Sequence, residues 1–171
     1  MALIKKCKNN KPKIHSTVFL ADNASVIGDV IIGENSSIWF NAVVRGDVNS
    51  ITIGKNVNIQ DGAVIHCTYQ KTKTVIGDNT SIGHNAIVHG CEIAGDALIG
   101  MGAIIMDNCH IQKNVVIAAG SVMLEGTKTE EGFLYAGTPA KKIKPLTVEQ
   151  IQKLVSDTPK NYIKYSKWFD Q

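Results

Sequence analysis

Hydrophobic side chains recur at every sixth residue through most of the chain. The pattern starts with Ile14, Leu20, Val26, Ile32, Ile38 and Val44. It resumes after longer steps at Ile53, Ile59, Ile65, Ile76, Ile82, Val88, Ile93, Ile99, Ile105, Ile111, Ile117 and Met123. Four places after most of these positions stands a small or β-branched residue, such as Ala24, Ala42, Ala63, Ala86 or Ala103. Both columns are expected to face inward.

Turn-forming residues separate these hydrophobic positions, as in Gly54-Lys55-Asn56 and Gly77-Asp78-Asn79. Gly adopts positive φ readily, and Asn and Asp hydrogen-bond to their own backbone. Short strands joined by tight turns at a period of six are typical of a hexapeptide β-solenoid, in which stacked coils form the core. The alternative, an amphipathic β-sandwich, predicts strict two-residue alternation and irregular turn spacing.

The ends of the chain depart from this pattern. Residues 14–144 are predicted to form the β-helix domain, and residues 1–13 to cap its start. Residues 125–144 break the six-residue spacing. Because a solenoid needs covered ends, this stretch and the helical segment expected at 145–171 are predicted to close the other end.

The C-terminal segment carries helix signals. Thr147 to Gln150 form a capping-box pattern, which predicts a helix start. Asp157-Thr158-Pro159 is expected to interrupt that helix. A second short helix would then carry aromatic residues that pack on the coils, among them Tyr162, Tyr165, Trp168 and Phe169.

Composition supports the strand prediction and excludes several partners. The chain has 22 Ile and 15 Val against 7 Leu, a mix that favours strands. A net charge of +3 with one arginine, Arg45, argues against nucleic acid binding. No apolar run approaches the roughly 18 residues that a membrane-spanning helix needs, and no signal peptide is evident at the start. We therefore expect no membrane partner and a cytoplasmic location. Four cysteines without a C-x-x-C pair are expected to be free thiols.

Two histidines occupy equivalent positions in successive coils. His66 directly follows Ile65, and His89 directly follows Val88. Their separation equals one 18-residue coil plus five inserted residues, so they should stack on one edge, about one strand spacing apart. Both imidazoles would then reach a single ion, for which metal–nitrogen bonds of roughly 2.0–2.1 Å are needed.

His84 follows Ile82 by two places and is therefore expected on another side of the coil. It cannot easily reach the same ion within one chain. A neighbouring subunit could supply it, and a cyclic trimer would create three equivalent sites of this kind. His15 and His110 lack such register partners, which predicts surface or packing roles.

Four polar residues lie near these histidines in the repeat. Arg45 is in the column of His66 and His89, with Asp47 two residues on. Gln60 and Asp61 follow Ile59 on the edge that carries His84. They could orient metal ligands or fix an interface. Alternatively, the arginine and aspartate form only an interface ion pair, and the glutamine is an ordinary surface amide.

These motifs resemble the γ-class carbonic anhydrase-like family over nearly the whole chain. The resemblance rests on Arg45-Gly46-Asp47, Asn58 to Asp61, His66, Ser81 to Gly90 and Ala136 to Lys141. It implies a left-handed parallel β-helix, a homotrimer, and Zn2+, Fe2+ or Co2+ at each interface. It also implies that His66 and His89 bind the metal from one subunit and His84 from the next. Handedness follows from the resemblance alone, because parallel crossovers are ordinarily right-handed.

The resemblance further implies a zinc-dependent lyase for reversible hydration of CO2 to bicarbonate. A metal-bound hydroxide would be the nucleophile. Arg45 and Asp47 would have an interface role, and Gln60 would lie near the metal-bound water. Tyr162 could enter the active site from the terminal helix, with core packing as the alternative.

The chain differs from active members of that family at two places linked to proton handling. Val48 stands where those enzymes carry a glutamate, and the insertion from Cys67 to Thr74 holds no carboxylate. Weak turnover is therefore expected. Two other functions stay open: a hexapeptide-family acyltransferase or thioesterase that uses a CoA ester, and a non-catalytic, metal-stabilised trimer.

Overall fold

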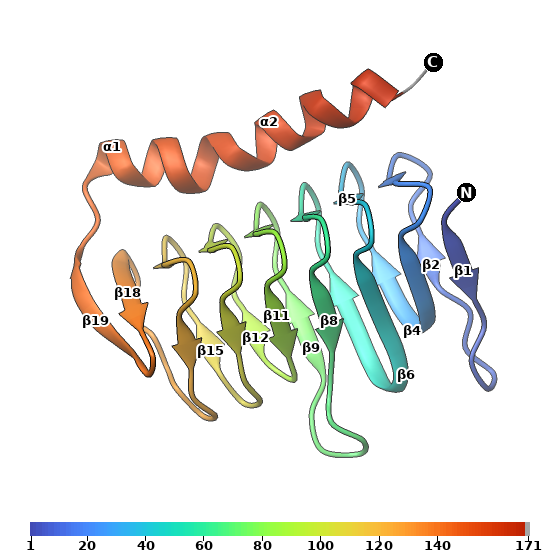
Figure 1. Cartoon of the computed structure of the whole chain (residues 1–171), viewed down its shortest axis with the longest axis horizontal. Coiled ribbons are helices and arrows are strands. Elements are labelled where there is room, and N and C mark those ends of the chain that lie inside the picture. The colour runs from blue at the N-terminus through green and yellow to red at the C-terminus, as the bar shows by residue number, and fades with distance from the viewer. Residues whose placement is uncertain (170–171) are drawn as a thin grey trace.

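The chain forms a β-solenoid followed by one helix (Figure 1). This structure, a computed structural model, describes residues 1–169, so the last two residues of the predicted helical segment 145–171 lie outside the described residues. The hexapeptide repeats fit a left-handed β-helix, which confirms the predicted fold class.

The strands form three stacks, in which each strand except β19 pairs in parallel with the equivalent strand of the next coil. The first stack contains β1 (Leu3–Lys5), the starts of β4 (Ser25–Ile32) and β6 (Val43–Ile53), β8 (Val64–His66), β11 (Ile87–His89), β14 (Ile104–Ile105) and β17 (Val122–Met123). The second contains β2 (Lys13–Ile14), the ends of β4 and β6, β9 (Thr74–Ile76), β12 (Glu92–Ile93) and β15 (His110–Ile111). The third contains β3 (Phe19–Leu20), β5 (Ser37–Ile38), β7 (Asn58–Ile59), β10 (Ser81–Ile82), β13 (Leu98–Ile99), β16 (Val116–Ile117), β18 (Phe133–Gly137) and β19 (Ala140–Pro145).

The two long strands, β4 and β6, continue around a corner of the coil. They therefore join the first and second stacks into one 11-stranded sheet, whereas the third stack is a separate 8-stranded sheet.

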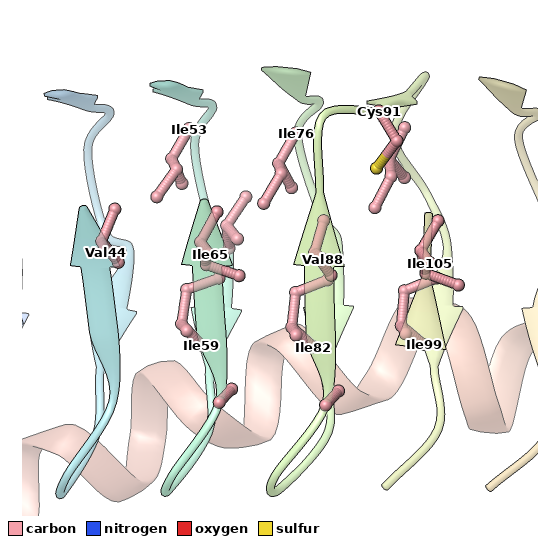
Figure 2. Packing of buried hydrophobic residues seen from close by; sticks show 14 of the residues in the cluster. Val44, Ile53, Ile59, Ile65, Ile76, Ile82, Val88, Cys91, Ile99 and Ile105 are labelled. Carbon is pink, nitrogen blue, oxygen red and sulfur yellow. The ribbon is translucent and has the colours of Figure 1, made fainter. Parts of the chain in front are cut away.

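Rows of isoleucine fill the interior (Figure 2). The parallel register places Ile59 beside Ile82 and Ile82 beside Ile99, all of them fully buried. The second predicted column is also inside, since Ala63 and Ala86 are fully buried. Full burial of one such isoleucine contributes about 1.5–3 kcal/mol, so the repeated row supplies the main stabilising term.

Successive coils approach closely at the corners. Gly33 shows why a side chain is excluded there, because a Cβ on it would lie 2.6 Å from the carbonyl oxygen of Gly54 in the next coil. Asn residues at several corners have positive φ, for example Asn56 at 55° and Asn79 at 56°. Their side chains form a ladder along the stack, in which Asn56 Nδ2 donates to Asn79 Oδ1 at 3.0 Å.

The solenoid continues further than the sequence pattern suggests. β18 pairs in parallel with β16, and Tyr135 lies beside Ile117 in the interior. The expected break across 125–144 therefore includes one more stacked strand, with an aromatic ring at the inward position. The parallel stack ends when β19 pairs antiparallel with β18.

The predicted interruption of the terminal helix is wrong. α1 (Val148–Gln150), the π-helical η1 (Ile151–Ser156), α2 (Asp157–Ser166) and the 3-10 turn η2 (Lys167–Phe169) form one continuous helix. The predicted capping box between Thr147 and Gln150 is present.

A wider turn accommodates the proline of this helix. The Asp157 N–H donates to the Gln152 carbonyl, five residues back. The Thr158 hydroxyl donates to the Leu154 carbonyl at 2.8 Å. Pro159, which has no N–H to donate, follows this wider turn and is buried.

This helix runs back along the solenoid toward its N-terminal end (Figure 1). Its aromatic residues pack on the third stack: the Trp39 ring lies 5.2 Å from that of Tyr162 and 5.8 Å from that of Phe169, between centroids. Val155 is buried against the coils. Within residues 1–169, no helix has the length and apolar character needed to span a membrane.

Candidate functional site

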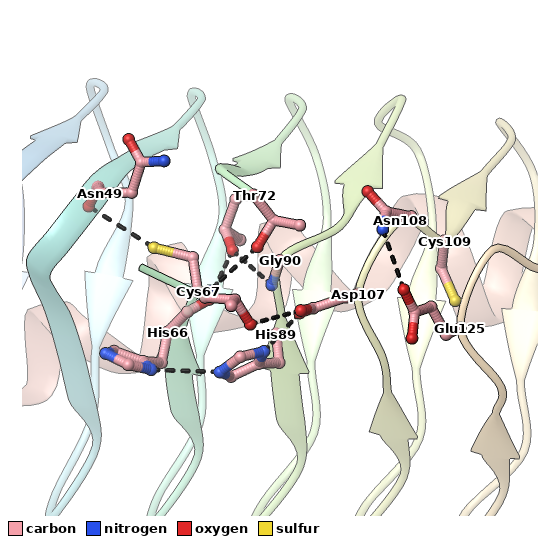
Figure 3. A network of polar contacts seen from close by, with 12 residues as sticks. Asn49, His66, Cys67, Thr72, His89, Gly90, Asp107, Asn108, Cys109 and Glu125 are labelled. Atoms are coloured by element: carbon pink, nitrogen blue, oxygen red, sulfur yellow. Dashed lines mark hydrogen bonds and ion pairs between the residues drawn. The ribbon is translucent and has the colours of Figure 1, made fainter. Parts of the chain in front are cut away.

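His66 and His89 lie side by side at the ends of β8 and β11. The two strands pair in parallel with these histidines as direct partners, so the register predicted from the repeat is confirmed. Nδ1 of His66 is 3.1 Å from Nε2 of His89 (Figure 3). The pair is mostly buried, with 17% and 32% of the two side chains exposed.

A carboxylate contacts the other nitrogen of each ring. Asp47 Oδ1 is 3.0 Å from His66 Nε2, and Asp107 Oδ1 is 2.5 Å from His89 Nδ1. Burial opposes ionisation of both aspartates, but hydrogen bonds outweigh it and lower each pKa below its usual value. The donors are His66 and Arg45 for Asp47, and Thr68 and His89 for Asp107.

The two carboxylates favour one position for the proton of each neutral ring. A neutral imidazole has one N–H and one lone pair, and each carboxylate accepts the N–H that faces it. The two nitrogens that face each other, His66 Nδ1 and His89 Nε2, therefore both present lone pairs. Lone pairs 3.1 Å apart repel unless a proton or a metal cation lies between them. The pair consequently has the donor chemistry of a cation site.

The spacing also suits a metal. Two nitrogens bound to one tetrahedral zinc, with metal–nitrogen bonds near 2.0–2.1 Å, are separated by roughly 3.3 Å. The observed 3.1 Å between His66 and His89 is close to that separation. Two ligands alone do not complete a zinc site, so at least one more is needed.

His84 lies at a different corner, in the turn between β10 and β11. Its Nδ1 is 2.8 Å from Asp61 Oδ2, and its Nε2 is 3.4 Å from the Tyr162 hydroxyl. None of these contacts is shared with the pair of His66 and His89. Within residues 1–169 of one chain, no three His, Cys, Asp or Glu side chains surround a common point. The three candidate ligands do share one feature, a carboxylate on one ring nitrogen.

Tyr162 lies on the packing surface of the helix and close to His84, and its entry into an active site stays a prediction. Its ring packs edge-on against Trp39, while its hydroxyl is directed toward His84. Burial, together with the negative charge of Asp61, raises the pKa of Tyr162 to about 12. The phenol is therefore protonated at neutral pH.

Gln60 is buried at the end of β7, with 5% of its surface exposed. Its Nε2 donates to Asn58 Oδ1 at 2.9 Å, and Asn58 Nδ2 donates to Ser81 Oγ at 2.8 Å. Gln60 is thus part of a polar network on the third stack, and its role near a metal-bound water stays a prediction.

Arg45 lies beside the histidine pair. Its guanidinium donates to Asp47 Oδ2 at 2.5 Å, while the other oxygen of that carboxylate faces His66. The ion pair is thus part of the site whether or not it also contacts a neighbouring subunit. The remaining histidines lie apart from it, since His15 contacts Thr17 and His110 lies 3.4 Å from Glu92.

Asp107 is the site residue that the sequence reasoning missed. It stands 18 residues after His89, which is one full coil, and the same register that placed the histidines could have found it.

Known proteins share this architecture. Residues 11–46 and 90–124 match the family described as bacterial transferase hexapeptide (six repeats). The mitochondrial gamma carbonic anhydrase 2 of Arabidopsis thaliana is 42% identical over 160 residues, which cover 91% of this chain and 57% of that protein. A carbonic anhydrase of Geobacillus kaustophilus is 40% identical over 147 residues, covering 86% of this chain and 80% of that protein.

A solved structure is also similar to this chain. The crystal structure of a hexapeptide transferase family protein from Anaplasma phagocytophilum has a TM-score of 0.93 and 40% identity, with 98% of each chain covered. The chain spans little more than half the length of the Arabidopsis relative but most of the Geobacillus one. The chain belongs to the γ-class carbonic anhydrase-like family of hexapeptide-repeat proteins.

Proposed function

We propose that this protein is a metal-dependent carbonic anhydrase that interconverts CO2 and bicarbonate at the subunit interfaces of a homotrimer. Two histidines of one subunit, His66 and His89, and His84 of the next would hold the metal. Zinc, iron(II) or cobalt(II) suits three imidazoles. The observation that carries the proposal is the approach of His66 Nδ1 to His89 Nε2, 3.1 Å apart, while a carboxylate contacts the other nitrogen of each ring.

The outer surface of the first stack supports the trimer. Val64 and Ile87 are 36% and 37% exposed there, in a row of outward-facing β-branched residues that also includes Val43, Ile104 and Val122. A contiguous exposed apolar stripe is typical of an interaction surface.

The candidate ligands flank this stripe. His84 precedes β11 and His89 ends it, so they stand at opposite edges of the same stack. A head-to-tail ring of three subunits that packs this stack against its neighbour brings the two edges together. The third ligand of each site would then come from the adjacent subunit.

Within this site the protein residues have distinct tasks. The three histidines would bind the metal, which when bound supplies a water of pKa near 7. Asp47, Asp61 and Asp107 would fix the histidine orientations through their contacts with the other ring nitrogens. Arg45 balances the charge of Asp47.

The proposed reaction lacks the two glutamates that the family links to proton transfer out of the site. Val48, at the position of a family glutamate, packs against the hydrophobic core. The inserted loop presents threonine hydroxyls in place of carboxylates, and those of Thr68 and Thr72 are engaged in hydrogen bonds. We therefore propose that turnover is slow relative to family members that carry both glutamates.

The experiment that tests this function compares CO2 hydration by zinc-loaded wild type, His66→Ala, His84→Ala and the control His110→Ala. Wild type and the control should be active, and both ligand variants should lose nearly all activity. Equal activity in wild type and His84→Ala would contradict the proposal.

Mixed trimers test whether the ligands come from two subunits. When His66→Ala and His84→Ala chains are refolded together, about one quarter of the interfaces should contain all three histidines, because each half of an interface is intact half of the time. Activity should recover to about that fraction. Two inactive variants that do not complement each other would place the site within one chain.

Acyl transfer from a CoA ester is the second candidate. It is supported by the likeness to the Anaplasma phagocytophilum transferase family protein. A cavity of about 430 Å³ beside the inserted loop, lined in part by Lys71, Lys73 and His110, could receive a substrate. Acyl transfer that persists after complete metal removal would favour this function.

The third candidate is the metal-stabilised trimer without catalysis. It would be supported if chelation of the metal dissociated the trimer while neither CO2 hydration nor acyl transfer was detected.

A further inference from the structure

Asp107 connects the inserted loop to a candidate metal ligand. One carboxylate oxygen, Oδ1, faces His89 Nδ1 at 2.5 Å, and the other, Oδ2, accepts the hydroxyl of Thr68 (Figure 3). Thr68 belongs to the loop of residues 67–73, which joins β8 to β9. The carboxylate is only 19% exposed, so both of its contacts are shielded from water.

Threonines of the loop and of the adjoining strand β9 hold the loop in place. The Thr68 N–H donates to Thr72 Oγ1 at 2.9 Å. The Thr74 hydroxyl donates to the His66 carbonyl at 2.6 Å and accepts the Gly90 N–H at 3.0 Å. These bonds attach the loop to the strands that carry both His66 and His89.

Gly90 leaves the space that Asp107 needs. It has a φ of 57°, and a Cβ on it would lie 2.1 Å from Asp107 Oδ1 and 2.3 Å from Thr72 Oγ1. Any larger residue after His89 would displace the carboxylate from the ring. The close approach of these groups therefore depends on the glycine as well as on the loop.

We propose that Asp107, held by Thr68, is a positioning residue that keeps the proton of His89 on Nδ1 and thereby directs the Nε2 lone pair toward the metal. This inference rests on the metal site of the proposed function. The loop then controls metal affinity through a chain of two contacts, from Thr68 to Asp107 and from Asp107 to His89.

A purely structural role for Asp107 would affect stability without affecting the proton position on His89. The test therefore uses Asp107→Asn, which keeps the size of the side chain but can present an N–H₂ group to Nδ1. Glu125→Gln is the matched control, because Glu125 lies one coil further on and contacts Asn108 instead of a histidine.

Two measurements are made on each full-length variant. Nitrogen-15 NMR of the metal-free protein reports which ring nitrogen of His89 carries the proton, and competition with a chromophoric chelator gives the zinc affinity. We expect Asp107→Asn to shift the proton toward Nε2 and to weaken zinc binding by about 10- to 100-fold, the usual effect of losing a residue that orients a metal ligand. Glu125→Gln should match wild type in both measurements.

Thr68→Val provides a second variant in case Asp107→Asn does not fold. It removes only the hydroxyl that holds Asp107, so zinc affinity should fall by about threefold or more, a threshold set below the roughly 10- to 100-fold loss typical of residues that contact a metal ligand directly. The proposal is overturned if either folded variant keeps the zinc affinity of Glu125→Gln, or if Asp107→Asn leaves the His89 proton on Nδ1.

The test of Asp107 can fail or succeed independently of the test of CO2 hydration. A wild-type protein that binds zinc but hydrates no CO2 would end the proposed activity and leave the NMR and affinity results on Asp107 standing. A wild type that binds none of zinc, iron(II) and cobalt(II) would overturn both.

Discussion

Neighbouring residues on one strand can have opposite structural roles, as β9 demonstrates. Ile76 faces the interior and is 1% exposed, whereas Val75 faces outward and is 39% exposed. The six-residue spacing of the sequence distinguishes the two, because only Ile76 belongs to the repeating column. At the level of single residues, the inward positions are therefore predictable from the sequence.

Substitution of these two residues by alanine should give unequal losses of stability. Ile76→Ala leaves a cavity among stacked side chains and should lower the free energy of unfolding by about 2–5 kcal/mol. Val75→Ala should lower it by less than about 1 kcal/mol, since much of its surface is already in water. Urea unfolding measures both values, and equal losses would show that the inward column is misassigned.

The cysteines should differ in their reaction with iodoacetamide. Cys67, Cys91 and Cys109 are buried, and burial raises the pKa of each thiol, so the reactive thiolate is scarce. Cys7 is partly exposed and unpaired. Mass spectrometry of the native protein should find one adduct, at Cys7, and four adducts after denaturation. Rapid native modification of Cys109 would contradict the packing of its coil.

Side-chain partners are harder to predict than side-chain direction. The repeat placed His66 beside His89, yet the contact between His89 and Asp107 depends on rotamers and on the path of the inserted loop. Residues in a loop do not follow the period of the coils, so Thr68 had no expected position.

At the level of the secondary structure elements, the distance between successive coils limits the size of the side chains at the corners. Gly33 and Gly102 are both corner glycines, but they are needed for different reasons. A Cβ on Gly33 would collide with the next coil, whereas Gly102 has open space around it and a φ of 66°.

Alanine should therefore be tolerated differently at these corners. Gly33→Ala forces two coils apart and should cost about 2–3 kcal/mol, as overpacking does. Gly102→Ala imposes only a left-handed backbone on a residue with a Cβ, at about 1 kcal/mol. Thermal unfolding of the two variants checks the order, and a larger loss for Gly102→Ala would show that contact between coils is not the limiting factor.

The terminal helix shows where local sequence signals fail. Asp157-Thr158-Pro159 reads as a break, because proline lacks the N–H that an α-helix needs. The helix widens by one residue just before it, and the Thr158 hydroxyl takes over the Leu154 carbonyl. Packing of Tyr162 and Phe169 against Trp39 favours this continuous path, and such tertiary contacts are not visible in local sequence.

At the level of the whole molecule, the outward face of the first stack is the surface through which we propose that chains associate. The histidine positions and the family resemblance predict a trimer from the sequence, but the apolar stripe is not evident there. Only the folded coil brings Val64 and Ile87 next to each other, since 23 residues separate them in sequence.

A charge in this stripe should dissociate the proposed trimer. Ile87→Lys should reduce the mass in solution from that of three chains to one of 18.5 kDa and should also weaken zinc binding, because each site would lose its third ligand. Light scattering after size-exclusion chromatography gives the mass. Val75→Lys is the control, with similar exposure on the second stack, and should leave the trimer intact. An Ile87→Lys protein that stays trimeric would rule out this face as the interface.

The path of the terminal helix affects how the solenoid unfolds. In a stack whose coils touch only their neighbours, coils can be lost one at a time from either end. Here the helix crosses several coils: residues near its middle border a cavity with Asn56, Asn79 and Asp96, and its last turn contacts Phe19. Coils at the N-terminal end and in the middle of the solenoid therefore pack against the same terminal helix. The stack should open as one cooperative unit, with hydrogen exchange of the inner strands governed by global unfolding.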